Sequence, residues 1–357
     1  YGDHRDLHRV DRRQRQMCIR DRSDTVTKPS KEMLDVIVNS EVGDDEYKED
    51  PTVNELEEFA ADLLGFESGL FVSSGLMGNQ ISLLNHTNPG EEVITTQDSH
   101  IKNYEHGAAS FLSRIQFRNV SHNDGDLNLD DIVSQISKSS YYKPKISTVA
   151  IENTHLASGG TIIPFENIKK LSEFTKSNNL KLHVDGARVW HAILEENTKA
   201  NYGKYCDSLT FCFSKGLGAP IGSMLLGSKD FIANSREYRK KIGGGMRQVG
   251  IIASAAKYAL ENRSNLITDH KMAKEVFTVI KNMENKIDCI ESVAYKGTNM
   301  ILLNFDTLSN SDEFLKYLAD NEIKAGYLRE KVIRFVFHKD VTLENKEKLI
   351  KTLQSFS

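Results

Sequence analysis

The sequence is poor in the features that mark several large classes of protein. Its 357 residues include only four cysteines, Cys18, Cys206, Cys212 and Cys289, whose spacing matches no zinc-binding pattern. We therefore predict no metal site and a reducing compartment such as the cytoplasm. No uninterrupted apolar run reaches the roughly 18 residues of a membrane span. The net charge of -4 gives no general attraction to nucleic acid. These absences leave a soluble enzyme acting on a small molecule, with neither nucleic acid nor a membrane as partner.

The first 22 residues differ in composition from the rest of the chain. The segment YGDHRDLHRVDRRQRQMCIRDR holds seven arginines and four aspartates, and too few apolar side chains to form a core. It lacks the apolar centre of a secretory signal, and its acidic residues are unlike those of a transit peptide. We expect residues 1–21 to be a disordered or foreign extension outside the fold, with a functional basic arm as the alternative.

From Pro29 onward, short β-rich runs alternate with segments of helical spacing. Strands are predicted at 69–72, 92–95, 146–151, 181–184 and 208–213. Helices are predicted at 54–64, 77–84 and 168–175. Such alternation is typical of an α/β protein with a mostly parallel sheet between helices, whose ligand binds at the carboxyl ends of the strands.

The end of the chain has a different pattern. The segment IIASAAKYALENR predicts a helix at 251–263. Residues from about 266 to 357 then mix helices with strands, which are expected at 299–305 and 332–337. We interpret this mixture as a smaller α+β domain. The predicted division is 22–260 for the large domain, including its N-terminal segment, and 261–357 for the small domain.

Lys215 lies in FCFSKGLGAPIGS, between a β-rich run and a glycine-rich loop. A lysine is most often a solvated surface residue. Here the preceding aromatic strand should be buried, and its end should deliver the amine into a sheltered crevice. An amine in such a place can form a Schiff base with a carbonyl group, so Lys215 is the candidate nucleophile.

Asp185 ends the predicted strand of LHVDGARVW and lies thirty residues before Lys215. That interval fits one more helix and strand, so the two side chains can converge from different strands. A lysine and a carboxylate at this edge suggest pyridoxal phosphate, with the lysine bound to its aldehyde and the aspartate keeping its pyridine nitrogen protonated. The alternative is that Asp185 only caps the following helix.

Two glycine-containing loops could bind the phosphate of such a cofactor. In FVSSGLMGN, a strand is followed by Ser74, Gly75 and Leu76 and then by a helix, whose first backbone amides would face an anion. The later GGGMRQ offers a second contact through Arg247. The patterns GxxxxGK[ST] and GxGxxG are absent from the positions where phosphate-binding folds need them. Either loop could also be a turn that binds nothing.

Eight segments, in consistent order from Arg22 to the C-terminus, carry a family resemblance. They are RSDTVTKPS (22–30), GDDEYKEDPTVNELE (43–57), SSGLMGNQ (73–80), DSH (98–100), IENTH (151–155), HVDGAR (183–188), FCFSKGLGAPIGS (211–223) and GGGMRQ (243–248). Together they resemble the threonine aldolases, which are pyridoxal-phosphate enzymes with the aspartate-aminotransferase fold. The set is far more specific than any one of its motifs.

The resemblance implies roles for individual residues. Lys215 would be the Schiff-base lysine, Asp185 the partner of the pyridine nitrogen, and His100 the imidazole on the cofactor ring. Whether His100 also acts as general base, with an ordered water, or only stacks on the ring is left open. The other implied cofactor contacts are Ser74, Gly75, Leu76, Arg188 and Arg247. The implied contacts to the substrate carboxylate are Ser23, Arg188 and Arg334.

Two departures from the family pattern affect these roles. Leu76 stands where the family commonly has a threonine, so only a backbone amide can contact the phosphate there, which predicts weaker phosphate binding. Some members also have a second active-site histidine upstream of IENTH, and SSYYKPK (139–145) contains none. No role can be transferred from that histidine, which leaves His100 as the candidate base.

The implied reaction is reversible cleavage of threonine or allo-threonine to glycine and acetaldehyde. A clamp on the substrate carboxylate by Arg188 and Arg334 would select the reaction by orienting the bond that breaks. A β-eliminating lyase of the same fold, which would release pyruvate, is the first alternative, and a catalytically silent binding protein is the second. The resemblance also implies a homodimer or homotetramer with shared sites, in which Arg247, and also Tyr47, would reach the neighbouring subunit.

Overall fold

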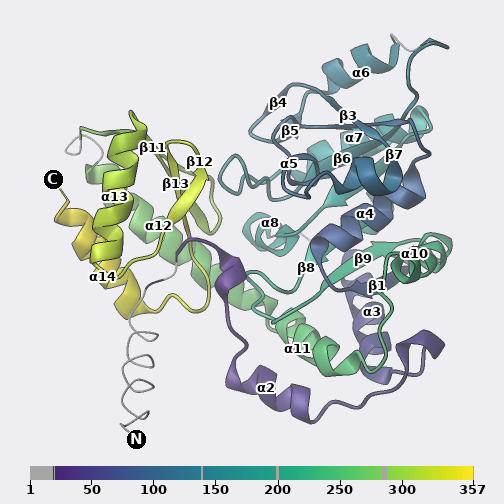
Figure 1. Cartoon of the computed structure of the whole chain (residues 1–357), viewed down its shortest axis with the longest axis horizontal. Coiled ribbons are helices and arrows are strands. Elements are labelled where there is room, and N and C mark those ends of the chain that lie inside the picture. The colour runs from purple at the N-terminus through teal and green to yellow at the C-terminus, as the bar shows by residue number, and fades with distance from the viewer. Residues whose placement is uncertain (1–18, 20, 138–139, 198–200, 284–287, 357) are drawn as a thin grey trace, which may run out of the picture. The chain divides into compact units, whose positions relative to one another are not determined.

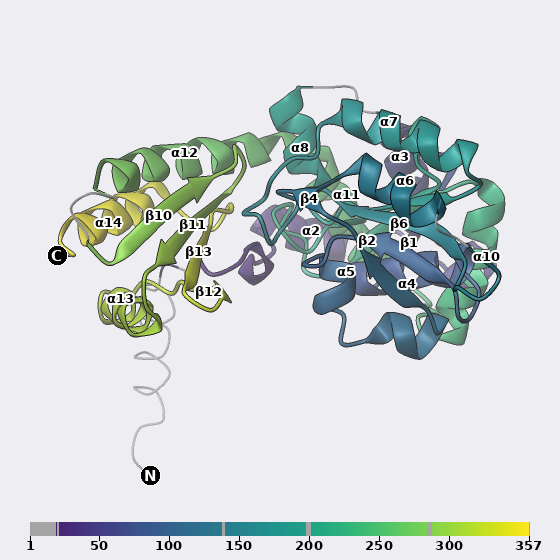
Figure 2. The ribbon, with the colours of Figure 1, turned by 90° about the horizontal axis from the view of Figure 1, so that it is seen from above.

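The computed structural model describes residues 19, 21–137, 140–197, 201–283 and 288–356 (Figures 1 and 2). The chain forms two compact units. The larger is Thr27–Ile267, and the smaller combines Tyr1–Val26 with Thr268–Ser357. In the described parts of both units, every helix is too short or too polar to cross a membrane.

The larger unit is built on a sheet with the strand order β1-β9-β8-β7-β6-β2-β3. The described strands of this sheet are β1 (Ser68–Val72), β2 (Glu92–Thr95), β3 (Gln116–Asn119), β6 (Ile146–Glu152), β7 (Lys181–Asp185), β8 (Ser208–Cys212) and β9 (Ser223–Gly227). β9 runs antiparallel to both of its neighbours, and the other neighbouring pairs are parallel. The carboxyl ends of β6, β7 and β8 therefore meet at one edge, as the alternating sequence pattern predicts. The small hairpin of β4 (His122–Asn123) and β5 (Asp126–Leu127) lies outside this sheet.

Helices cover the sheet of the larger unit (Figure 1). They include α2 (Lys31–Val38), α3 (Pro51–Leu64), α4 (Gly75–His86), α5 (His100–Asn103), α6 (Leu129–Ser137), α7 (Phe165–Ser177), α8 (Val189–Glu196), α9 (Tyr202–Tyr205), α10 (Lys229–Lys241) and α11 (Gly250–Glu261). Some begin earlier than predicted. α3 starts at Pro51 because Asp50 accepts a hydrogen bond from the Val53 amide and proline suits the first helical position. α4 starts at Gly75 because Ser74 caps it.

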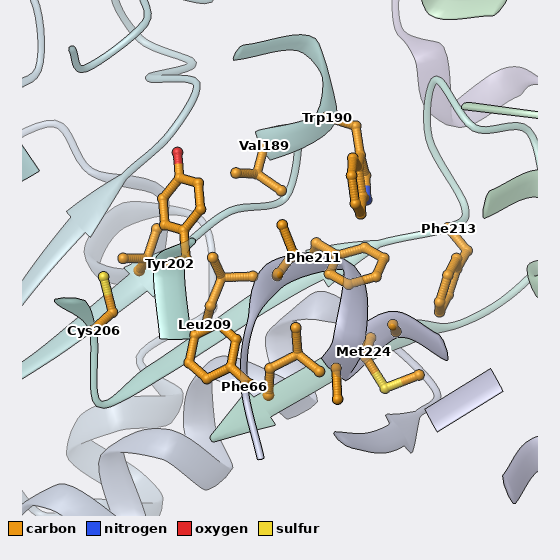
Figure 3. Packing of buried hydrophobic residues seen from close by; sticks show 14 of the residues in the cluster. Phe66, Val189, Trp190, Tyr202, Cys206, Leu209, Phe211, Phe213 and Met224 are labelled. Carbon is orange, nitrogen blue, oxygen red and sulfur yellow. The ribbon is translucent and has the colours of Figure 1, made fainter. Parts of the chain in front are cut away.

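Aromatic side chains fill the main core on one face of the sheet. Phe211 of β8 lies between Trp190 and Phe213, with ring centroids 5.6 and 4.9 Å from theirs (Figure 3). Leu182 and Val184 of β7 belong to the same core. Because side chains alternate along a strand, the other residues of β7, including its last one, face the opposite side of the sheet.

α4 packs on that opposite side and approaches β8 closely through two glycines. A Cβ atom on Gly75 would lie 2.7 Å from Sγ of Cys212, and one on Gly78 would lie 2.6 Å from Cγ2 of Thr210. Both distances are too short for any side chain. The two glycines therefore let the helix backbone lie directly against the strand, with its amino end near the carboxyl edge of the sheet.

The smaller unit combines an antiparallel sheet with three described helices. Its strands are β10 (Ile290–Tyr295), β11 (Met300–Phe305), β12 (Gly326–Arg329) and β13 (Val332–Val336), in the order β10-β11-β13-β12. Its helices are α12 (Leu266–Met283), α13 (Leu308–Asp320) and α14 (Leu343–Gln354). This is the α+β pattern expected for the end of the chain. The division falls after Ile267 rather than near residue 260, because α11, which ends at Glu261, runs through the predicted boundary and belongs to the larger unit.

Part of the expected N-terminal extension belongs to the smaller unit. Ile19 is buried and forms a parallel bridge with Ile323, and Asp21 is buried while its carbonyl accepts a hydrogen bond from the Val336 amide. The expectation that residues 1–21 lie outside the fold is therefore wrong at positions 19 and 21, because an apolar side chain and strand-like hydrogen bonds attach them. The segment 22–26 also joins the smaller unit, and not the large domain as predicted. Residues 1–18 and 20 lie outside the described residues.

Asp21 makes a testable contribution to stability. Its carboxylate oxygens are buried without a hydrogen-bond partner among the described residues, and burial raises its pKa from 3.8 to about 7. A pKa raised by folding means that the contribution of Asp21 to stability falls as the pH rises from about 4 to about 7. Asp21→Asn removes this loss, which is on the order of 2–4 kcal/mol. We expect the melting temperature of the variant to exceed that of the parent at pH 8, and we expect this difference to be much smaller at pH 5.

The control for this comparison is Asp35→Asn, at an exposed position of α2. Its melting temperature should follow that of the parent at both pH values. An equal difference between Asp21→Asn and the parent at pH 5 and pH 8 would show that the carboxyl group of Asp21 does not titrate as described.

Candidate active site

Lys215 and Asp185 follow the ends of neighbouring parallel strands. Asp185 is the last residue of β7 and pairs in register with Thr210 of β8. Lys215 lies three residues beyond the end of β8, in a turn that holds its backbone firmly. Its carbonyl accepts hydrogen bonds from the amide of Gly218 at 2.8 Å and from Oγ1 of Thr27 at 3.1 Å. The structure thus places the predicted amine and the predicted carboxylate at the same edge of the sheet.

Both oxygens of the buried Asp185 carboxylate accept hydrogen bonds. Oδ2 accepts from Nδ2 of Asn79 at 2.9 Å, and Oδ1 accepts from the amide of Ala187 at 3.2 Å. The hydrogen bond to Ala187 is local, as expected if Asp185 capped the following helix, but α8 begins only at Val189. The bond to Asn79 comes from α4 and has nothing to do with capping. Asp185 is therefore held by two separate parts of the fold.

His100, the first residue of α5, lies beside two carboxylates. Its Nδ1 is 3.2 Å from Oε1 of Glu105 and 4.0 Å from Oδ2 of Asp185. Its backbone amide donates to Oε2 of Glu152, the last residue of β6, at 2.8 Å. Burial lowers the pKa of His100, but the hydrogen bond to Glu105 and the charge of Asp185 outweigh burial, so its pKa lies above the ordinary value. The protonated form of the imidazole is thus more favoured here than in an ordinary histidine.

Glu105 and Asn79 are site residues that the sequence analysis did not identify. Glu105 is buried, its pKa is raised by that burial, and it accepts hydrogen bonds from Asn79, Gln80 and His100. Asn79 uses its amide group for Glu105 and Asp185 at once. The available signal was the pair of adjacent amide side chains in SSGLMGNQ, which follows the apolar residues at the start of the helix.

Glu105→Gln should lower the pKa of His100. The substitution keeps the shape of the side chain but removes the charge that stabilises the imidazolium, so we expect the pKa of His100 to fall. Titration of the His100 ring by NMR measures it. The control is Glu166→Gln, which removes an exposed partner of Lys169 and should leave the titration unchanged. An unchanged midpoint in Glu105→Gln would show that Glu105 does not set the charge of His100.

The amino end of α4 has the chemistry of an anion site. Among the described residues, none accepts a hydrogen bond from the amides of Gly75 or Leu76, the first two residues of this helix. The Ser74 hydroxyl oxygen accepts from the Met77 amide at 3.2 Å, so it also serves as the helix cap. The Leu76 side chain is partly exposed and adds no polar group. Only the backbone can offer hydrogen bonds at that position.

The two predicted arginines of the larger unit lie in different surroundings. Arg188 is buried directly before α8, three residues after Asp185. Arg247 is exposed, and its Nη1 lies 3.0 Å from Oδ2 of Asp44. The loop 243–247 does not reach away from its unit, because the Arg247 carbonyl accepts from the Asp45 amide at 3.1 Å. Tyr47, in the same acidic segment, is also exposed. Contacts of Arg247 and Tyr47 with a second subunit stay a prediction.

Ser23 and Arg334 belong to the smaller unit, where they lie in the same neighbourhood. Nη2 of Arg334, on β13, donates to the carbonyl of Arg22 at 3.0 Å. Oγ of Ser23 lies 2.9 Å from Oγ1 of Thr25. Their binding of a substrate carboxylate stays a prediction. In the stretch 139–145, residue 139 lies outside the described residues, and Tyr141 is fully exposed.

His100, Glu105 and Asp185 also have the residue types of a metal site, and their ligand atoms all lie within 4.8 Å of one another. The contacts of the group favour a hydrogen-bond network. Asn79 donates to both carboxylates, and His100 lies within hydrogen-bonding distance of one of them. A cation at the centre would have to displace these donors.

Comparisons with known proteins identify the family of this chain. Residues 22–306 match the Beta-eliminating lyase family. The chain is 37% identical to the low-specificity L-threonine aldolase of Escherichia coli (strain K12) over 326 residues, which cover 90% of this chain and 94% of the relative. It is 38% identical to low-specificity L-threonine aldolase 1 of Arabidopsis thaliana over 329 residues, which cover 90% and 91%.

A solved structure extends the likeness to the fold. The threonine aldolase of Leishmania major superposes with a TM-score of 0.78 over 94% of this chain and 98% of its own, at 20% sequence identity. The expected aspartate-aminotransferase-like fold is thereby confirmed. Because the family pattern spans most of the sequence and curated relatives align over nearly their full length, this chain belongs to the Beta-eliminating lyase family and, within it, to the threonine aldolases.

Proposed function

We propose that this chain cleaves L-threonine and L-allo-threonine to glycine and acetaldehyde with pyridoxal phosphate as its cofactor. The observation that carries the proposal is the position of Lys215 and Asp185 at neighbouring strand ends, with His100 beside the carboxylate. The curated relatives are named low-specificity L-threonine aldolases, which supports threonine as the substrate and the use of both threonine and allo-threonine.

The residues present fit pyridoxal phosphate. Asp185 offers a buried carboxylate for the pyridine nitrogen, and Lys215 offers the amine that would hold the aldehyde. The amides of Gly75 and Leu76 would hold the phosphate, since the close approach of Gly75 to Cys212 leaves the helix end without a side chain at that point. When bound, the cofactor supplies a conjugated ring that accepts the electron pair of the breaking Cα–Cβ bond.

His100 is the base that the geometry favours. Its Nδ1 faces Glu105, so the neutral ring carries its proton there and leaves Nε2 as the acceptor. Nε2 would take the β-hydroxyl proton of the substrate as the Cα–Cβ bond breaks and the aldehyde leaves. The resulting imidazolium is stabilised by Glu105 and Asp185, and the proton can then pass on to solvent or product. A proton delivered to Cα completes glycine.

Arg188 is proposed to bind the substrate carboxylate. A guanidinium can hold a carboxylate through two parallel hydrogen bonds, which fixes the rotation of the substrate about its Cα–N bond. That rotation decides which bond at Cα breaks, so orientation by Arg188 separates aldol cleavage from other reactions of the same cofactor. Arg334 and Ser23 stay predicted as further contacts to this carboxylate.

The test is to incubate the purified protein and pyridoxal phosphate with L-threonine and L-allo-threonine in separate reactions. We expect acetaldehyde and glycine in equal amounts from both. Release of 2-oxobutanoate, the product of β-elimination from threonine, in place of glycine and acetaldehyde would instead identify a β-eliminating lyase. No product from any β-hydroxy amino acid, with the cofactor bound, would leave the catalytically silent alternative.

A further inference from the structure

A chain of buried polar groups leads away from Asp185 beneath α4. Its members, which we call the donor chain, are Asn79, His183, Ser208 and His86. Asn79 and His86 lie on α4 two helical turns apart and so share one face of it. His183 is two residues before Asp185 on β7 and faces the same side of the sheet, and Ser208 is its register partner on β8.

Every link in the donor chain has hydrogen-bond length. Nδ2 of Asn79 is 2.9 Å from Asp185, and Oδ1 of Asn79 is 3.1 Å from Nε2 of His183. Nδ1 of His183 is 2.8 Å from Oγ of Ser208, which is 2.8 Å from Nε2 of His86. Asn79, His183 and Ser208 are fully buried or nearly so, so water does not compete for these bonds.

The direction of the first link is fixed by charge. Asn79 faces the carboxylates of Asp185 and Glu105 with the same end of its side chain. Both carboxylates accept hydrogen bonds, so that end must be the amide nitrogen, with one hydrogen for each. The oxygen of Asn79 therefore faces His183 and can only accept. It follows that Nε2 of His183 carries a proton.

The remaining links follow from the charge state of His183. Burial lowers its pKa to about 4, against a smaller opposing effect of Asp185, so the ring is neutral near pH 7 and its Nδ1 is an acceptor. Ser208 then donates to His183 and accepts from His86. Burial, together with the nearby His183, lowers the pKa of His86 to about 3, so His86 is neutral and carries its proton on Nε2. All four donors thus point toward Asp185.

We infer that the donor chain holds the carboxylate of Asp185 in position and stabilises its negative charge, which makes Asn79 and His183 positioning residues for the reaction. The inference rests on the proposed function, in which Asp185 keeps the pyridine nitrogen protonated. Aligned hydrogen bonds polarise one another, so each buried link strengthens the bond that reaches the carboxylate. The effect should weaken with distance from Asp185.

The first test is the tautomeric state of the histidines in the cofactor-loaded, ¹⁵N-histidine-labelled protein. Long-range ¹H–¹⁵N NMR spectra distinguish the two neutral tautomers, and spectra of His183→Phe and His86→Phe assign the signals. We expect both rings to be neutral, with the proton on Nε2, from pH 6 to pH 9. A proton on Nδ1 of His183, or a positively charged ring in this range, would overturn the orientation of the donor chain.

The second test measures the dissociation constant for pyridoxal phosphate. We expect Ser208→Ala to raise it about threefold and His183→Phe to raise it roughly tenfold, which corresponds to the loss of one or two buried hydrogen bonds. The matched control is Ser82→Ala. Ser82, on α4, is buried like Ser208 but donates to the Gly78 carbonyl, outside the donor chain. The dissociation constant of this variant for pyridoxal phosphate should stay within twofold of that of the parent.

The outcomes separate the donor chain from mere structural support. If Ser208→Ala and Ser82→Ala lose similar melting temperature but only Ser208→Ala loses cofactor affinity, the inference holds. Equal affinity in both variants would contradict it, even if His183→Phe fails to fold. The histidine tautomers can be read without any catalysis. A protein that binds the cofactor with the expected tautomers but cleaves no threonine would therefore refute the proposed function alone.

Discussion

Lys215→Ala should lose nearly all cleavage of L-threonine, a decrease of roughly 10⁴-fold or more. The amine of Lys215 is the group proposed to hold the cofactor aldehyde, and alanine leaves no nucleophile at that position. The visible absorbance of the cofactor-loaded protein should disappear along with the activity. Steady-state kinetics and absorbance spectra of the variant, after loading with pyridoxal phosphate, measure both effects.

Lys229→Ala is the matched control for this substitution. Lys229 is exposed at the start of α10 in the same unit, just after Gly227, which pairs with Ser208 at the amino end of β8. Its loss therefore removes a lysine without touching the carboxyl ends of β7 and β8. It should keep the absorbance and the rate of the parent. Substantial cleavage by Lys215→Ala, or an unchanged visible spectrum, would mean that another amine binds the cofactor.

Asp185→Asn should lower kcat by roughly 10³-fold, or about 4 kcal/mol of transition-state stabilisation, while the protein stays folded. A neutral amide cannot hold a proton on the pyridine nitrogen, so the ring accepts electrons poorly. The single amide oxygen of the new side chain can accept from either Asn79 or Ala187. Its NH2 group must then face the other N–H donor, so one of the two hydrogen bonds is lost. We therefore expect a melting temperature a few degrees lower.

Asp207→Asn tests the specificity of that loss. Asp207 lies at the amino end of β8, where it accepts from the Leu182 amide and pairs with Lys181. It is a strand-associated carboxylate at the opposite edge of the same sheet. The variant should lose stability but keep kcat. A near-normal kcat in Asp185→Asn would show that the partner of the pyridine nitrogen lies elsewhere.

The strand-end residues could be predicted because local sequence determines them. Lys215 and Asp185 each follow a short run of buried β-type residues, and parallel strands must end at a common edge. The antiparallel direction of β9 could not be predicted in the same way, because SMLLG is buried along its whole length and carries no mark of its direction. Its position between β1 and β8 results from long-range pairing.

The polar surroundings of the site could not be predicted for a related physical reason. Asn79 meets Glu105 and Asp185 only because α4 lies close against β8, which depends on Gly75 and Gly78 having no side chains. Sequence spacing shows that a helix follows β1 but not how near it comes to the sheet. The burial of Ile19 was missed for a similar reason, since its partner Ile323 lies far along the chain.

The claim on which all other steps depend is that Lys215 carries the cofactor. The direct measurement is to load the full chain with pyridoxal phosphate, reduce it with borohydride, digest it, and locate the modified lysine by mass spectrometry. We predict a single pyridoxyl-phosphate group on the peptide that contains FSKGLGAPIGS, with Lys215 as the modified residue. Modification of a different lysine, or the absence of any stable modification, would contradict the assignment.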